Sequence, residues 1–273
     1  MNAANKDQLN IVVCVKAVPS TTEVKMDPKT NTIVRDGKQA VVNPFDASAL
    51  EVALRIKDER ATTGDNTRVT CVSMGIPATE RLLRDCVARG ADAGLLLSDR
   101  AFAGADTLAT SYALTCGIES LPQAADLVVC GKMAVDGDTA QIGPELAGAF
   151  DVPCVAGVSE VVGLCGRALT LRRDSDEGSE LVRVELPCVI TVSKDAAALR
   201  MPTISGVRAG EAARIDVLTA EGAGADLARC GLTGSPTQVV RSFVPERSHE
   251  SVRIEGAPAD QAAAFAELLE GMK

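Results

Sequence analysis

The sequence predicts an α/β fold: a doubly wound, mostly parallel sheet of the Rossmann-like kind, with an added β hairpin and an extended C-terminal arm. Short runs rich in Val and Leu alternate with longer amphipathic stretches as far as Pro153, where the long helical patterns stop. Hydrophobic residues make up 46% of the chain and aromatic residues only 2%. The core must therefore be packed from Val, Leu, Ile and Ala, the usual filling of a buried parallel sheet.

Each element follows from this alternation. The expected strands cover residues 10–16, 67–74, 94–97 and 126–131, and the expected helices cover 44–60, 77–89, 104–117 and 139–149. Strand–helix–strand order of this kind implies right-handed crossovers and a parallel sheet.

The second half of the chain has a different pattern. Residues 167–173 and 181–191 are expected to form a hairpin around the polar turn 174–178, and residues 195–210 a loop. The tail shows little periodicity before a short amphipathic helix at 259–270. We expect one α/β domain over residues 1–210 and a C-terminal arm over 211–273 that packs on a partner.

Composition excludes several classes of function. A net charge of −9 and the scarcity of aromatic residues argue against nucleic-acid binding. The apolar runs are strand-sized, well short of the roughly 20 residues that span a bilayer, and the polar start of the chain has no signal-peptide core, so no membrane insertion is expected. Nine cysteines without a CxxC pair, and one histidine, predict no metal site and buried thiols in a reducing cytoplasm.

No catalytic residue is predicted, because the lone His249 lies in a polar tail and the chain has no Walker A or GxGxxG pattern. The best candidate for a binding site is the stretch 131–143, GKMAVDGDTAQIG, which follows an apolar strand and opens a helix. Ligands bind at the carboxyl ends of strands in an open parallel sheet. Gly137 would allow close approach or positive φ, Asp138 or Thr139 would cap the helix with Gln141 reaching back, and the first-turn N–H groups suit a pyrophosphate. An ordinary capped helix start explains the same residues about equally well.

Two further segments lie at expected strand ends. Asn43, Pro44 and Asp46 form a strong helix start, which a well-capped helix explains completely. Ser73-Met74-Gly75 ends the 67–74 strand and is a weak signal by itself.

Together these segments resemble the beta family of electron-transfer flavoproteins. The matching motifs, in order, are IVVCVKAVP, NPFDASALEVALRIKD, RGAD, GKMAVDGDTAQIGPELAGAF and LPCVITV, and they cover most of residues 10–210. The resemblance implies that an adenine nucleotide lies between the end of the first strand, the NPF turn and the DGDT loop. The positions it implies for contact with the nucleotide are Cys14, Asn43, Pro44, Phe45, Asp46, Met74, Asp136, Gly137, Asp138, Thr139, Ala140, Gln141, Ile142 and Gly143. Some members of the family carry a cysteine at the place of Met74.

The resemblance also implies cofactors and partners. Members of one branch hold AMP here as a structural ligand, beside an alpha subunit that binds the redox FAD; electron-bifurcating members hold a second FAD instead. The form DGDTAQIGPE, with small residues at Gly137, Thr139 and Ala140, is similar to the bifurcating branch. Such a subunit passes electrons from NADH to a ferredoxin or flavodoxin and to an acyl-CoA dehydrogenase. The alternatives are a non-bifurcating carrier with AMP and, from another class, a stand-alone nucleotide sensor of the stress-protein type, which the hairpin and tail disfavour.

One motif departs from the family. Its partner-docking loop usually reads Leu-Asn-Glu-Pro-Arg after the LPCVITV strand, whereas this chain has Ala196-Ala197-Ala198-Leu199-Arg200. The resemblance assigns docking to Ala196, Leu199 and Arg200, with Leu199 in place of the missing leucine. We expect an exposed turn that presents Leu199, with Arg200 beside it for charge complementarity.

Overall fold

The computed structural model describes residues 8–20, 40–137, 139–240, 251 and 253–271. The contacts within the chain divide it into two units, residues 1–239 and residues 240–273. The two units are described separately below, and the functional division into a domain over residues 1–210 and an arm over 211–273 stays a prediction.

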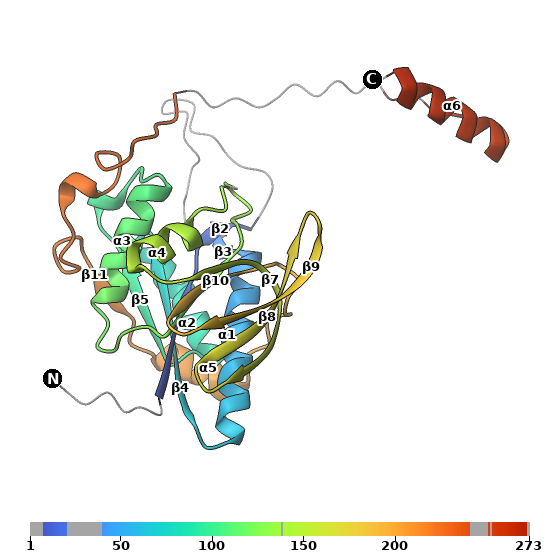
Figure 1. Cartoon of the computed structure of the whole chain (residues 1–273). Helices are drawn as coiled ribbons and strands as arrows, with labels where there is room; N and C mark the ends of the chain where they lie inside the picture. Colours follow the sequence, from blue (N-terminus) through green and yellow to red (C-terminus); the bar gives the residue numbers. More distant parts are fainter. Residues whose placement is uncertain (1–7, 21–39, 138, 241–250, 252, 272–273) are drawn as a thin grey trace. The chain divides into compact units, whose positions relative to one another are not determined.

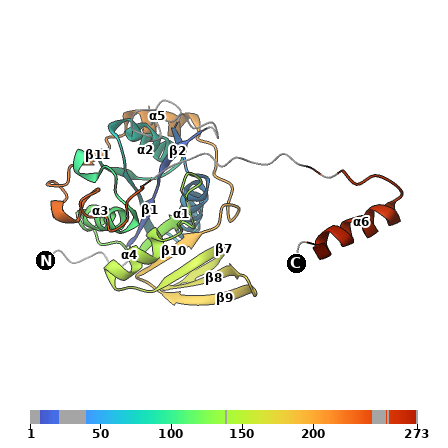
Figure 2. The same cartoon turned by 90° about the horizontal axis from the view of Figure 1, so that it is seen from above.

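The first unit contains a nine-stranded sheet (Figure 1) with the order β11-β5-β4-β1-β6-β10-β7-β8-β9. The strands are β1 (Gln8–Cys14), β4 (Asn66–Met74), β5 (Ala93–Leu97), β6 (Leu127–Gly131), β7 (Cys154–Cys165), β8 (Ala168–Ser175), β9 (Gly178–Glu185), β10 (Cys188–Val192) and β11 (Asp216–Leu218). All neighbours are parallel except β7 with β8 and β8 with β9. The predicted doubly wound sheet and its hairpin, β8–β9, are confirmed, and Figure 2 shows β7, β8 and β9 side by side at one end.

Helices cover both faces of the sheet because its central strands are apolar on both sides. Ile11 and Val13 of β1 face a core cluster with α1 (Pro44–Thr62) and α2 (Glu80–Ala88). Val12 and Cys14 face the other cluster, with α3 (Thr107–Glu119) and α4 (Ile142–Phe150). Successive side chains of a strand point to opposite faces, which explains why β1 reads as one continuous apolar run.

Two elements after Pro153 differ from expectation. Residues 154–165 form β7, which the sequence did not predict: Gly157 has a φ of 74° and the pairing register shifts beside it, so the strand lacks a regular alternation. The expected single segment 181–191 is two strands, β9 and β10, separated at the cis bond between Leu186 and Pro187.

The predicted loop 195–210 is wrong in its second half, which forms α5 (Ile204–Ala212). Thr203 caps this helix, its Oγ1 accepting a hydrogen bond from the N–H of Gly206 at 3.0 Å. Gly206 and Gly210 do not break the helix, because a Cβ at either position would collide with the backbone of α2 at Ala88 or Arg84. These glycines therefore allow α5 to pack closely on α2.

The first part of the expected C-terminal arm returns to the sheet. β11 pairs with β5, and the Asp99 carboxylate accepts from the N–H of Ala220 at 3.0 Å. Further along, the guanidinium of Arg229 lies 3.8 Å from the ring centre of Tyr112, and the Asp106 carboxylate accepts from the Thr237 hydroxyl at 2.9 Å. Residues 216–237 thus pack on their own unit; packing of the arm on a partner stays a prediction for the rest.

The remaining elements of the first unit are short. β2 (Ala17–Pro19) and β3 (Ala40–Val42) form a separate antiparallel pair, and there are 3-10 turns at Pro77–Thr79, Arg100–Phe102 and Leu227–Arg229. The predicted helix 77–89 is thus a 3-10 turn followed by α2.

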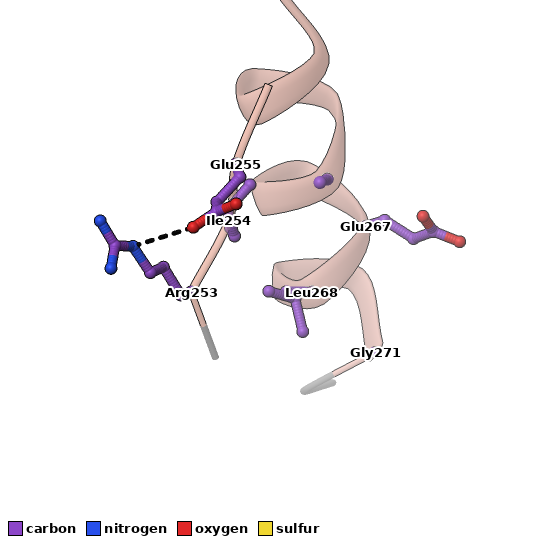
Figure 3. A pocket seen from close by; sticks show the side chains of 7 residues that line it. Arg253, Ile254, Glu255, Glu267, Leu268 and Gly271 are labelled. Atoms are coloured by element: carbon purple, nitrogen blue, oxygen red, sulfur yellow. Dashed lines mark ion pairs between the residues drawn. The ribbon is translucent and has the colours of Figure 1, made fainter. Parts of the chain in front are cut away.

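The second unit consists of the helix α6 (Pro258–Gly271) and the segment before it. Figure 3 shows Ile254 and Leu268 beside a shallow hollow, and the ion pair between Arg253 and Glu255, whose Nε and Oε1 atoms are 3.2 Å apart. No residue of α6, as far as it is described, is buried. Among the described residues, no helix combines the length and the apolar character that crossing a bilayer needs.

Candidate functional site

The candidate site lies where the strand order reverses. From β1 the chain runs outward to β4 and β5 on one side, then returns to place β6 on the other side of β1. The carboxyl ends of β1 and β6 therefore lie at the topological switch point, the usual ligand position in an open α/β sheet. The stretch 132–141 begins here, directly after β6.

Asn43 ties this stretch to the start of α1. The residue stands at the helix N-cap with Pro44 after it, as predicted, but its side chain makes no capping hydrogen bond. Its Nδ2 instead donates to the carbonyl of Met133 at 2.8 Å, and its Oδ1 accepts from the N–H of Val135 at 3.2 Å. The buried Asn43 side chain thus positions the loop after β6.

Asp46 joins the ends of the two central strands. Its Oδ2 accepts from the N–H of Lys16 at 2.8 Å, and its Oδ1 accepts from the N–H of Gly131 at 3.1 Å. Burial raises the pKa of Asp46 to about 7, although the hydrogen bonds from Lys16, Asn43 and Gly131 oppose that rise. Both carboxylate oxygens are therefore occupied by protein donors.

Gly131 is required by this close approach. A Cβ at Gly131 would collide with the Asp46 carboxylate and would lie 2.7 Å from the Cβ of Phe45. Gly131 opens the stretch 131–143 that the sequence predicts as a binding site, but no role was predicted for it; its position at the end of an apolar strand, next to a polar loop, is the signal that marks it.

An ion pair fixes the middle of the stretch. The Lys16 Nζ lies 2.6 Å from the Asp136 Oδ1, and the side chains are 42% and 8% exposed respectively. The backbone of 132–141 is thus attached to the rest of the unit near Met133, Val135 and Asp136. Asp138 lies outside the described residues, and the other members of the stretch from Gly137 to Gln141 are exposed.

The helix after this stretch starts later than expected. α4 begins at Ile142 with Gln141 at its N-cap and no side-chain capping bond, so the predicted cap at Asp138 or Thr139 is wrong. The Gln141 Oε1 lies 3.3 Å from the Thr107 Oγ1, a hydroxyl that also donates to Glu145 at 3.0 Å. Gly137 was expected to allow a positive φ, but the residue of this stretch that has a positive φ is Ala140, at 54°.

Most of the predicted nucleotide-contacting residues lie at the same edge of the sheet. Cys14 ends β1, Met74 ends the adjacent β4, and Gly143 is buried so close to Thr191 that a Cβ would collide with it. Cys14 is buried beside Cys130, and this neighbour, together with burial, raises the pKa of the Cys130 thiol. Whether these residues contact a nucleotide stays a prediction.

The predicted docking residues lie elsewhere, along α1. Leu199 is half-buried against the core rather than exposed, and Ala197 is buried, its N–H donating to the Ser48 hydroxyl at 2.9 Å. The Arg200 guanidinium is paired with the buried carboxylate of Glu51 at 2.9 Å. The expected exposure of Leu199 is therefore wrong, and the docking role of these residues stays a prediction.

The described residues contain no cluster of His, Cys, Asp and Glu that could hold a metal ion. What they contain is a fixed loop with an exposed centre, at the switch point of a doubly wound sheet.

Comparison with known proteins agrees with this arrangement. Residues 30–221 match the model of the electron transfer flavoprotein domain. The chain belongs to this family, as its resemblance predicted.

Its relatives define its place within the family. It is 42% identical over 245 residues to the electron transfer flavoprotein subunit beta of Thermoanaerobacterium thermosaccharolyticum, covering 89% of this chain and 91% of the relative. It is 41% identical over 255 residues to the caffeyl-CoA reductase-Etf complex subunit CarD of Acetobacterium woodii, covering 93% and 95%. It is also 38% identical over 263 residues to the protein FixA of Azorhizobium caulinodans, covering 92% of each chain. The chain is an electron transfer flavoprotein subunit of the beta type.

Proposed function

We propose that this chain binds FAD at the carboxyl edge of β1 and β6 and takes part in flavin-based electron bifurcation. In this role NADH is the proposed electron donor; the proposed acceptors are a low-potential ferredoxin or flavodoxin and, by way of an alpha subunit with its own FAD, an acyl-CoA dehydrogenase. The observation that carries the proposal is the loop 132–141, which is fixed at Met133, Val135 and Asp136 and leaves small residues exposed directly after them.

Small side chains favour FAD over AMP as the ligand. Gly137 has open space around it, since a Cβ there would meet no atom within 4 Å, and Thr139 and Ala140 are exposed. Backbone without bulky side chains lets a ligand's phosphates and ring system approach closely. The name of CarD, a subunit of a reductase–Etf complex, is consistent with a chain that works inside a larger redox assembly.

The protein residues have defined tasks around such a ligand. Asn43 and Asp46 hold the two strand ends and the loop, and the Lys16 ammonium supplies a positive charge beside an otherwise acidic stretch. Bound FAD would supply the redox chemistry. The chain's own contribution is to bind the group and to orient it through these fixed segments.

An alpha subunit is the proposed partner of the second unit. α6 exposes Phe265, Leu268 and Leu269, which are 56%, 42% and 51% exposed. An isolated helix of fewer than about 12–15 residues is marginally stable in water, so most of its stability must come from packing of its apolar side. We expect a heterodimer in the cytoplasm, and we expect the chain expressed alone to aggregate on a sizing column. A well-folded monomer loaded with nucleotide would contradict this expectation.

The nucleotide content of the purified heterodimer tests the choice of ligand. Acid release followed by chromatography should give two FAD per heterodimer. One FAD with one AMP would instead indicate a non-bifurcating carrier that holds AMP structurally, and a colourless ATP-binding monomer would indicate a nucleotide sensor. NADH-dependent reduction of ferredoxin that requires an enoyl-CoA-type acceptor would then establish bifurcation.

A further inference from the structure

The loop 132–141 contains a chemically labile pair of residues. Aspartate is followed by glycine at Asp36-Gly37 and at Asp136-Gly137, and the second pair lies among the residues that the structure describes. Glycine has no Cβ to shield its backbone nitrogen, so this nitrogen can approach the carboxyl carbon of a preceding aspartate. Asp136-Gly137 is therefore a candidate site for a reaction of the main chain with a neighbouring side chain.

The reaction requires only water. The Gly137 nitrogen forms a bond to the Cγ of Asp136, and the amide hydrogen and the carboxyl OH leave together as water, which closes a succinimide ring. A second water molecule then opens the ring. Addition of water at Cγ restores aspartate, whereas addition at the main-chain carbonyl carbon gives isoaspartate, in which the chain continues through Cγ. The composition is unchanged overall, but isoaspartate lengthens the main chain by a methylene group.

Both reacting groups are engaged in the folded chain. The Asp136 Oδ1 lies 2.6 Å from the Lys16 Nζ, and the Asp136 side chain is 8% exposed. Lys16 is itself fixed, because its N–H donates to the buried Asp46 at 2.8 Å. Charge-assisted hydrogen bonds of this kind are among the strong ones. An Oδ1 held by Lys16 restricts the side-chain rotation that would bring the Cγ of Asp136 to the Gly137 nitrogen.

The surroundings of Gly137 provide little further restraint. Its N–H donates to the Ala134 carbonyl at 3.3 Å, which is long for a backbone hydrogen bond. A Cβ at Gly137 would meet no atom within 4 Å, and Thr139 and Ala140 are exposed. Packing therefore does not stop the backbone at Gly137 from shifting, and the ion pair of Asp136 with Lys16 is the strong contact at this pair of residues.

We propose that Asp136-Gly137 is a site of spontaneous isomerisation to isoaspartate, and that the ion pair with Lys16 restrains this reaction in the folded protein. Isoaspartate would displace Gly137 relative to Val135, whose N–H is held by Asn43. Lys16 thus preserves the shape of the loop over the lifetime of the protein. The inference does not depend on which ligand the loop binds.

Peptide mapping of the aged heterodimer tests the proposal. The heterodimer is kept for days at neutral pH and raised temperature, and isoaspartate at residue 136 is quantified by chromatography and by labelling with an isoaspartyl methyltransferase. Lys16→Met removes the ammonium and should raise the rate several-fold toward that of the wild-type chain unfolded in urea. Lys16→Arg keeps a cation and should stay near the wild-type rate. Lys16→Gln replaces Lys16→Met if that variant does not assemble.

Two controls accompany these variants. Lys57→Met removes an ion pair of the same length, 2.6 Å between Nζ and the Asp92 Oδ1, and should leave the rate at residue 136 unchanged. Asp36-Gly37 is an internal reference whose rate should be equal in wild type and in Lys16→Met.

The rates decide between the ion pair and other causes of protection. Equal rates at residue 136 in wild type and in Lys16→Met overturn the proposal, as does a folded wild type that reacts as fast as the unfolded chain. Wild type stripped of its nucleotide is measured alongside. Slow reaction there with fast reaction in Lys16→Met assigns the protection to Lys16, whereas fast reaction in both assigns it to the ligand and overturns the proposal.

Discussion

Two segments of this chain are held by the same helix but differ in what they leave exposed. The loop 132–141 is attached to the first turn of α1 through Asn43, and the segment 196–204 is attached to later turns through Ser48 and Glu51. The loop leaves small residues exposed around Gly137, whereas the segment exposes Met201 and Ile204. Open backbone suits a phosphate-bearing ligand, and large apolar side chains suit a protein. The helix α1 therefore holds the loop of the proposed ligand site and an exposed apolar segment in a fixed relation.

The largest effect is expected at Gly131, where the end of β6 lies against Asp46 and Phe45. Gly131→Ala places a Cβ against the Asp46 carboxylate and Phe45, so it should destabilise the heterodimer by about 1–3 kcal/mol and release the ligand of this subunit. Thermal unfolding and nucleotide content measure the two effects. Gly148→Ala, where a Cβ meets no atom within 4 Å, is the control and should be neutral or slightly stabilising. Normal ligand content in Gly131→Ala would show that the close contact between Gly131 and Asp46 does not shape the ligand site.

Asp46→Asn should have the next largest effect and should change the response to pH. An amide has one oxygen, so one of the N–H groups of Lys16 and Gly131 loses its acceptor, at a cost of about 1–3 kcal/mol. Because burial raises the pKa of Asp46 from 3.8 to about 7, the folded chain keeps a proton that the unfolded chain releases between those values. The carboxyl's contribution to stability therefore falls as pH rises from about 4 to 7, and it levels off above pH 7. The unfolding free energy of wild type minus that of the variant should therefore fall from about pH 4 to pH 7 and stay constant above pH 7. A difference that does not depend on pH would contradict the raised pKa of Asp46.

Leu199→Ala should have a smaller effect, and on stability rather than docking. The side chain is half-buried against the core, so its loss should cost about 1–2 kcal/mol, less than the roughly 2–5 kcal/mol of a fully buried leucine. Delivery of electrons to the dehydrogenase should stay within about two-fold of wild type. A large loss of delivery with an unchanged melting temperature would return the docking role to Leu199.

The sequence predicted well those features that depend on local pattern. Apolar runs located β1, β4, β5 and β6, and Asn43-Pro44 located the start of α1. The sequence did not predict the features that depend on contacts between residues far apart in the chain. Residues 195–210 were predicted to be a loop, yet Gly206 and Gly210 allow α5 to approach α2, and Gln141 rather than Asp138 or Thr139 is the N-cap of α4. The roles of Asn43 and Glu51 depend on partners about 90 and 149 residues away in the chain, which no local pattern reveals.

The central claim is that the loop after β6 binds the nucleotide of this subunit. Gly137→Val tests it most directly, because a Cβ at Gly137 lies in open space, where a bound ligand would meet the added side chain. Measured beside Gly148→Ala, the Gly137→Val heterodimer should keep its melting temperature within a few degrees in the absence of added nucleotide, and should lose one nucleotide per heterodimer while it retains the FAD of the alpha subunit. Full retention of both nucleotides would contradict the claim and place the site elsewhere.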